Sequence, residues 1–164
     1  MTEALTFKEI LTVVFTAILP YAELRGAIPL AILAYKANPW EAFFWAVLGN
    51  ALPIIPVMLF IPMLGRWADR NAFIHRVMGW LHRKTEKNRD KINKYGLLGL
   101  AIFVAIPLPL TGVWTGAAIA YLLGIRKRFA FFALLLGAVG AGIIVTVATI
   151  FGISFNDYLQ TIVH

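Results

Sequence analysis

The feature that most constrains this chain is a set of apolar stretches long enough to cross a lipid bilayer. A helix of roughly 20 apolar residues crosses the hydrocarbon core, and the stretches at 40–64 and 129–153 both exceed that length. Hydrophobic residues make up 60% of the 164 residues, whereas a soluble domain has about 45–50%. We therefore predict an all-α integral membrane protein, with one membrane domain over residues 1–164 and two transmembrane helices.

Two further apolar stretches, 6–36 and 95–125, are interrupted near their middle by proline and glycine. Proline removes a backbone donor and clashes with the preceding helical turn. Each stretch is thereby divided into two arms that are too short to cross a bilayer, which predicts two re-entrant helical hairpins. The residues that we expect to shape the two hairpin tips are Pro20, Gly26, Pro29, Pro107, Pro109, Gly112 and Gly116.

The basic residues indicate how these segments are oriented. Nine of the 15 Lys and Arg residues lie within 65–94, and three more follow one another at 126–128. The positive-inside rule then places both flanks of 95–125 in the cytoplasm, which a re-entrant hairpin satisfies and a single span does not. The flanks of 6–36 are less decisive, so a kinked full span stays open there beside the hairpin. Apolar residues share one helix face in 65–94, which predicts a basic amphipathic linker helix at the cytoplasmic surface.

The order of these segments predicts an inverted repeat. The first repeat, 6–64, joins a hairpin to the span 40–64, and the second, 95–153, joins a hairpin to the span 129–153. Interrupted apolar segments at matching positions of two halves indicate the binding site of a transporter. An alternative of four kinked helices with ordinary prolines fits the lengths but leaves the basic flanks of the second hairpin unexplained.

Glu23 and Arg25 are ionisable residues in the middle of an otherwise uncharged run, Ile10 to Tyr35. A charge in hydrocarbon costs about 2.5–3.5 kcal/mol on insertion scales, so such residues indicate a functional site by default. Glu23 is a candidate carrier of a coupling proton. Arg25 is suited to bind phosphate or carboxylate through two parallel hydrogen bonds. In the structural alternative, the two residues form an ion pair that only holds the tip together.

Four uncharged polar residues complete the candidate substrate or ion site: Asn50, Thr111, Trp114 and Thr115. The two threonines bind a substrate or ion, or else cap the broken helix locally. Asn50 either braces a tip or lines the transport path. The chain has no cysteine, and no pattern of residues indicates an enzyme, a metal site or a cofactor. The net charge of +7 comes largely from the linker and does not suggest binding to nucleic acid.

Three motifs resemble the small multidrug export protein family, which is distantly grouped with the DedA/VTT membrane proteins. They are ELRGAIP at 23–29, GNALP at 49–53 and PLPLTGVWTG at 107–116. The resemblance implies paired re-entrant hairpins in an inverted repeat. DedA relatives are linked to moving lipid carriers such as polyprenyl phosphate, often with proton coupling. Their second hairpin usually carries an arginine near its tip, and this chain has none there.

Together these features predict a small transporter in the inner or plasma membrane, with Glu23 as the candidate residue for proton coupling. It would move an amphipathic or anionic substrate through a site between the two tips. A lipid-carrier flippase and a non-transporting membrane scaffold are the alternatives. Because two spans enclose little volume, we expect a homodimer. The N-terminal residues lack the basic region and small-residue cleavage site of a signal peptide, so we expect none to be removed.

Overall fold

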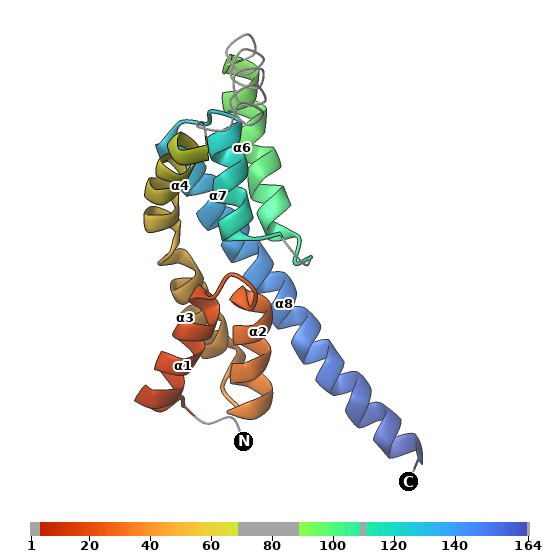
Figure 1. Cartoon of the computed structure of the whole chain (residues 1–164). Coiled ribbons are helices and arrows are strands. Elements are labelled where there is room, and N and C mark those ends of the chain that lie inside the picture. The colour runs from red at the N-terminus through yellow and green to blue at the C-terminus, as the bar shows by residue number, and fades with distance from the viewer. Residues whose placement is uncertain (1–3, 69–88, 109–110, 164) are drawn as a thin grey trace.

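The computed structural model describes residues 4–68, 89–108 and 111–163, which form helices joined by short turns (Figure 1). Two helical stretches, Pro39–Ile61 and Lys127–Ile153, are long and apolar enough to cross a membrane. They coincide closely with the spans predicted at 40–64 and 129–153. The all-helical prediction is therefore confirmed, together with its two long apolar helices.

The first half of the chain begins with two short helices packed against each other. Helix α1 (Phe7–Ile18) starts at a capping box, in which the Thr6 N–H donates to Glu9 Oε2 at 2.8 Å. After a four-residue turn, α2 (Glu23–Pro29) continues directly into η1 (Leu30–Ala34), a π-helical segment. The π segment directly follows Pro29, whose missing N–H already interrupts the helical hydrogen-bond ladder.

The first long apolar stretch consists of α3 (Pro39–Ala51) and α4 (Ile54–Ala68), separated by a two-residue turn. Asn38 caps α3, because its side-chain oxygen accepts a hydrogen bond from the Trp40 N–H at 3.0 Å. The Leu5 N–H donates to Glu41 Oε2 at 3.0 Å. This bond ties the start of α1 to the start of α3, so both helices begin at the same end of the molecule (Figure 1).

The second half contains α6 (Arg89–Ala105), α7 (Val113–Leu122) and the long helix α8 (Lys127–Val163). Helix α7 ends at Leu122 and is followed by its C-cap Leu123 and by Gly124, which has a φ of 61°. The Ile125 N–H reaches back to the Ala120 carbonyl at 2.9 Å, which closes the helix as a Schellman motif. Helix α8 packs along α6 and also contacts α2 and α3 in the first half.

Small residues let these helices approach one another closely. A Cβ added at Gly137 would lie 2.6 Å from the Val104 Cβ, and one at Gly142 would lie 2.8 Å from Val47 Cγ2. Gly116 on α7 is equally confined, by side chains of α6 and α8. Such residues allow close helix packing in membranes. The small residues of α8 thus contact helices of their own chain.

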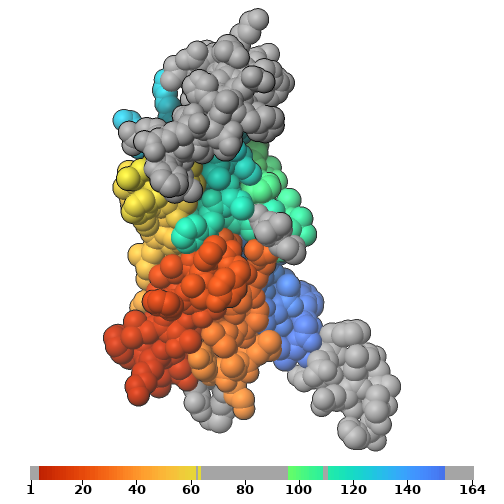
Figure 2. All heavy atoms as spheres, viewed as in Figure 1, coloured from red at the N-terminus to blue at the C-terminus, as the bar shows by residue number. Residues whose placement is uncertain are grey.

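The two helix pairs lie at opposite ends of the molecule. In Figure 1, α1 and α2 lie at one end, α6 and α7 lie at the other, and the turn within each pair faces the middle. In Figure 2 the surface of the first pair directly meets that of α7. The predicted linker helix 65–94 falls largely on 69–88, outside the described residues. The insertion of each pair into a membrane from one side, the inverted repeat and the repeat boundaries stay predictions.

Candidate functional site

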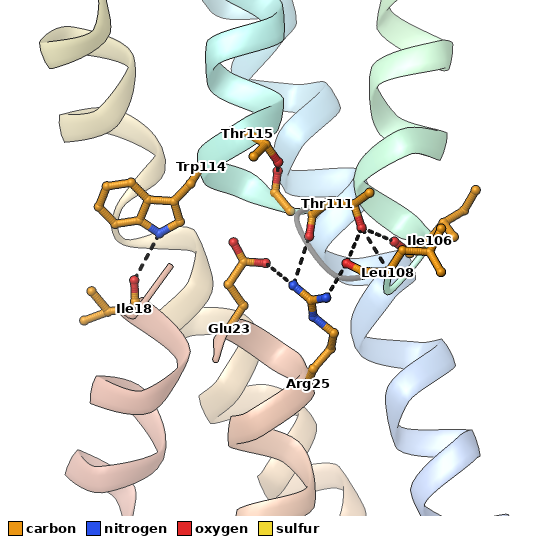
Figure 3. A network of polar contacts seen from close by, with 9 residues as sticks. Ile18, Glu23, Arg25, Ile106, Leu108, Thr111, Trp114 and Thr115 are labelled. Carbon is orange, nitrogen blue, oxygen red and sulfur yellow. Dashed lines mark hydrogen bonds and ion pairs between the residues drawn. The ribbon is translucent and has the colours of Figure 1, made fainter. Parts of the chain in front are cut away.

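The candidate site is the contact between the two interrupted segments. We call residues 19–25 the first tip, residues 106–115 the second tip, and their contact the tip junction. Residues 109 and 110 of the second tip lie outside the described residues. Figure 3 shows that the side chains of Glu23 and Arg25 point from the first tip toward the second.

Glu23 places a carboxylate on the N-terminus of α7. Its carboxylate accepts hydrogen bonds from the backbone N–H groups of Val113 and Trp114, and the residue is only 5% exposed. A helix N-terminus carries unpaired N–H groups and a partial positive charge, both of which favour a carboxylate. A Cβ on Gly112 would overlap this carboxylate. Glycine at 112 therefore makes room for the contact.

The backbone of Glu23 has an unusual conformation. Its φ is 45°, in the left-handed region that few residues other than glycine adopt. The Glu23 N–H nevertheless donates to the Leu19 carbonyl at 3.0 Å, which fastens the turn after α1. Such conformations persist only where the surroundings impose them, and they cluster at functional sites.

Arg25 binds the other side of the second tip. Its Nη1 donates to the Leu108 carbonyl, and its Nη2 donates to the Thr111 carbonyl at 3.2 Å (Figure 3). The Arg25 Nη2 lies 4.0 Å from Glu23 Oε2, a weak ion pair by distance. The guanidinium is thus held mainly by backbone carbonyls of the turn after α6. Its planar set of donors suits two neighbouring oxygens better than an ammonium would.

Thr111 shapes the turn that Arg25 binds. Its hydroxyl lies 2.6 Å from the Ile106 carbonyl and 2.8 Å from the Leu108 carbonyl, and accepts from the Leu108 N–H at 3.0 Å. These bonds hold the turn in which the Leu108 and Thr111 carbonyls face Arg25. Thr115 donates to the Gly112 carbonyl at 3.3 Å. Both hydroxyls therefore make local hydrogen bonds in this structure, as the capping alternative expects.

Trp114 adds a link in the opposite direction. Its Nε1 donates to the carbonyl of Ile18, the last residue of α1, at 3.1 Å (Figure 3). The last carbonyls of a helix have no partner within that helix, so this bond satisfies an acceptor that α1 leaves free. The second tip thus also binds a backbone group of the first segment, at the end of α1 directly before the first tip.

Asn50 lies in the last turn of α3 and is 1% exposed. Its Oδ1 has no hydrogen-bond partner within the part of the chain that the structure describes. A buried acceptor without a partner costs about 1–3 kcal/mol. The Asn50 Oδ1 therefore makes no hydrogen bond to the described residues of the tip junction, and the role of Asn50 as a brace or path residue stays a prediction.

The tip-shaping residues fall in different places. Pro20 lies in the first turn and Pro107 in the second, and Pro109 lies outside the described residues. Gly26 and Pro29 lie within α2, because the helix resumes at Glu23. A Cβ on Gly26 would lie 3.0 Å from that of Ala22, so this glycine keeps the start of α2 compact. Among the described residues, no group of three His, Asp or Glu side chains is placed to hold a metal ion.

Sequence reasoning missed the partners that the second tip supplies. They are backbone groups: the carbonyls of Leu108 and Thr111, and the N–H groups of Val113 and Trp114. The available signal was the break at 107–112, because an interrupted helix exposes unpaired carbonyls on one side and unpaired N–H groups on the other.

Comparison with known proteins identifies a family. A sequence model of the family described as "putative small multi-drug export protein" matches residues 23–144. This range begins at Glu23 and contains both charged residues and the whole second tip. No curated protein matches the chain, and no solved structure matches it.

Proposed function

The chain belongs to the small multi-drug export protein family, and from this premise we propose that it is a membrane transporter whose barrier is the tip junction. One observation carries this proposal. The two charged residues of the first tip bind helix ends and turn carbonyls of the second, which lies 83 to 86 residues away from Arg25 in sequence. A contact that joins the two halves through charges in an apolar protein is a suitable place to open and close a path.

The chemistry of the junction supports a coupled mechanism. In the closed arrangement the Glu23 carboxylate is held by N–H groups, and Arg25 is held by carbonyls. Protonation of Glu23 would remove the charge that favours the N-terminus of α7, and would thereby loosen the contact. Arg25, once released from Leu108 and Thr111, would have its donors free for the anionic part of an amphipathic substrate. Proton entry and substrate binding would then use the same two residues.

We further propose that both helix pairs are re-entrant and form an inverted repeat. At 1.5 Å per residue, the 12 residues of α1 extend about 18 Å, well short of the roughly 30 Å hydrocarbon core. Helix α7 has 10 residues and is shorter still. Non-helical backbone in a membrane is tolerated where protein buries it, and the tip junction would provide that burial.

The proposal includes a plasma-membrane location with the segment 65–94 in the cytoplasm. It also includes a homodimer, because α3–α4 and α8 enclose little volume. Side chains of the same chain already pack against Gly137 and Gly142. A partner subunit would therefore have to contact another face of α8 or the outer faces of the shorter helices.

Flux through proteoliposomes tests the proposed function. The purified full chain would be reconstituted, and uptake of a cationic dye and of a labelled polyprenyl phosphate would be measured with and without a pH gradient. We expect Glu23→Gln to abolish the effect of the pH gradient and Arg25→Gln to lower uptake of the anionic substrate at least tenfold. Glu9→Gln is the matched control, because glutamine can replace glutamate in a capping box.

The outcomes separate the candidate functions. Pumping of the dye alone would favour drug export, and movement of polyprenyl phosphate would favour the lipid-carrier flippase. Normal uptake of both by folded Glu23→Gln and Arg25→Gln variants would contradict a transport role for the junction. Absence of uptake of either probe by the unaltered chain would favour the scaffold alternative.

A further inference from the structure

A groove runs along the surface beside the tip junction. It has a volume of about 710 Å³, within the roughly 300–1,000 Å³ typical of ligand pockets. Helices α4 and α7 and the end of α1 form its walls. Its lining residues are Ile18, Leu52, Pro53, Pro56, Val57, Phe60, Ile61, Trp114 and Ala118.

The lining of this groove is suited to hydrocarbon. None of the lining residues carries a charge, and two prolines, one in the turn before α4 and one within α4, lack N–H donors. Leu52 and Phe60 are 54% and 62% exposed. Both belong to the stretch Pro39–Ile61, which is long and apolar enough to cross a membrane. The open side of the groove would then face lipid chains and not water.

Two lining residues connect the groove with the tip junction. Trp114 and Ile18, which line the groove, are joined by the hydrogen bond from the indole N–H to the Ile18 carbonyl. The backbone N–H of the same Trp114 donates to the Glu23 carboxylate. One residue therefore contacts both the apolar groove and the buried charge. This arrangement matches the two parts of an amphiphile, a hydrocarbon chain and a polar head.

A second apolar groove offers a comparison within the same molecule. It has a volume of about 420 Å³ and lies between the start of α3 and α8, with Trp40, Phe43 and Ile143 among its lining residues. None of its lining residues belongs to either tip. Ordinary membrane lipid would fill both grooves, whereas a transported amphiphile has a reason to prefer the first.

We propose that the groove beside Trp114 holds the hydrocarbon chain of the transported amphiphile, which enters sideways from the bilayer with its head at the tip junction. This inference rests on the proposed function and deepens it, because it assigns the substrate to a class: amphiphiles dissolved in the membrane. Substrates that approach only from water are outside this class.

Photolabelling tests the proposal without any measurement of transport. The full chain would be reconstituted in phosphatidylcholine vesicles with an alkyl phosphate that carries a diazirine on its chain, and labelled peptides would be mapped by mass spectrometry. We expect labelling of 52–61 to exceed labelling of the groove at Trp40 at least fivefold. An excess of unlabelled alkyl phosphate should compete, and added phosphatidylcholine should not.

Bulky substitutions provide the matched comparison. Ala118→Trp fills the groove and should lower the labelling of 52–61 at least fivefold. Ala34→Trp introduces the same side chain at an exposed position of η1, outside both grooves, and should change nothing. Because Ala118 is partly buried, Leu52→Trp at a more exposed wall position serves as a second variant if Ala118→Trp does not fold.

Equal labelling of the two grooves, unchanged by either groove variant, would overturn the proposal and identify ordinary lipid as the occupant. Selective labelling in a protein that moves no substrate would contradict the transport function while keeping the groove as a binding site. Transport with no selective labelling would contradict the groove and leave the transport function standing.

Discussion

The two tips contribute different chemical groups to their contact: charged side chains from the first and backbone groups from the second. The first tip carries both charges, Glu23 and Arg25, whereas the second tip has no ionisable side chain among its residues 106–115. The second tip instead offers the N-terminus of α7 to the carboxylate and the carbonyls of Leu108 and Thr111 to the guanidinium. A break made of proline and glycine is therefore a binding surface in its own right, because it exposes backbone donors and acceptors without adding charge.

This division of roles suits a protein that resides in hydrocarbon. Each additional charged residue would raise the cost of insertion, and a second arginine or glutamate on the opposing tip would add such a cost. Helix ends and turns supply partial charges from groups that every residue already has.

Substitution of Gly112 should lower stability most, because it disrupts the contact with Glu23 from the second tip, which carries no charge. Gly112→Ala places a Cβ on the Glu23 carboxylate and displaces it from two backbone donors. Hydrogen bonds to a charged group contribute about 1.5–3 kcal/mol each, partly offset by rearrangement, and alanine at a φ of 159° adds about 1–3 kcal/mol of backbone strain. We therefore expect a loss of about 4–6 kcal/mol in the free energy of unfolding. Denaturant unfolding in detergent micelles measures it.

The same substitution in a Glu23→Ala background gives a sharper test. There the carboxylate is absent, so Gly112→Ala should cost only the backbone strain of alanine at a φ of 159°, about 1–3 kcal/mol, and the two changes should be strongly non-additive. Additive losses would mean that Gly112 and Glu23 act independently, which would contradict the junction as described.

Arg25→Lys should come next, with a loss of about 2 kcal/mol. A lysine keeps the charge but cannot present the planar pair of donors that reaches the Leu108 and Thr111 carbonyls together. The matched control is Arg126→Lys, at an exposed position outside the junction, which should leave stability unchanged. Equal unfolding midpoints for Arg25→Lys and the unaltered chain would show that charge alone holds the second tip.

The two threonines of the second tip should differ from each other. Thr111→Val removes a hydroxyl with three close backbone partners, and we expect a loss of about 1.5 kcal/mol. Thr115→Val removes one bond at 3.3 Å and should cost less than about 0.5 kcal/mol. Thermal unfolding of the two variants side by side makes the comparison, and a reversed order would indicate that Thr111 does not shape the turn.

Trp114→Phe should cost about 1 kcal/mol, because it keeps an aromatic ring in the groove and deletes only the donor to the Ile18 carbonyl. Trp40→Phe is the control, since Trp40 is 77% exposed and lies far from the tips along α3. Unfolding in micelles would again measure both. A smaller loss of unfolding free energy for Trp114→Phe than for Trp40→Phe would show that the hydrogen bond from Trp114 to the Ile18 carbonyl does not stabilise the contact.

The long elements and the charged residues could be predicted from sequence. Apolar length alone located the stretches that became α3–α4 and α8, because crossing a bilayer requires about 20 such residues. Charge in an apolar run was enough to single out Glu23 and Arg25. The ends of the first break were harder, since Pro29 interrupts one helical hydrogen bond without ending the helix, which continues as η1.

The partners of these charges could not be predicted from residue types. Every residue has a backbone carbonyl and all but proline an N–H, so nothing distinguishes Leu108 or Val113 as a binding group until the turn is built. The left-handed conformation of Glu23 is equally invisible, because glutamate rarely adopts it. Such information resides in the packing of the two halves and not in either segment.

Helix α8 packs closely against both halves of the chain within one short stretch that contains Gly137 and Gly142. Val104 of α6 presses against Gly137, and Val47 of α3 presses against Gly142, so the two grips are about one and a half helical turns apart. Any movement of one half relative to the other would therefore have to change the packing of α8 at one or both of these glycines. A bulky residue introduced at either glycine would disturb the packing of α8 against one of the two halves, although the glycines lie outside the tips themselves.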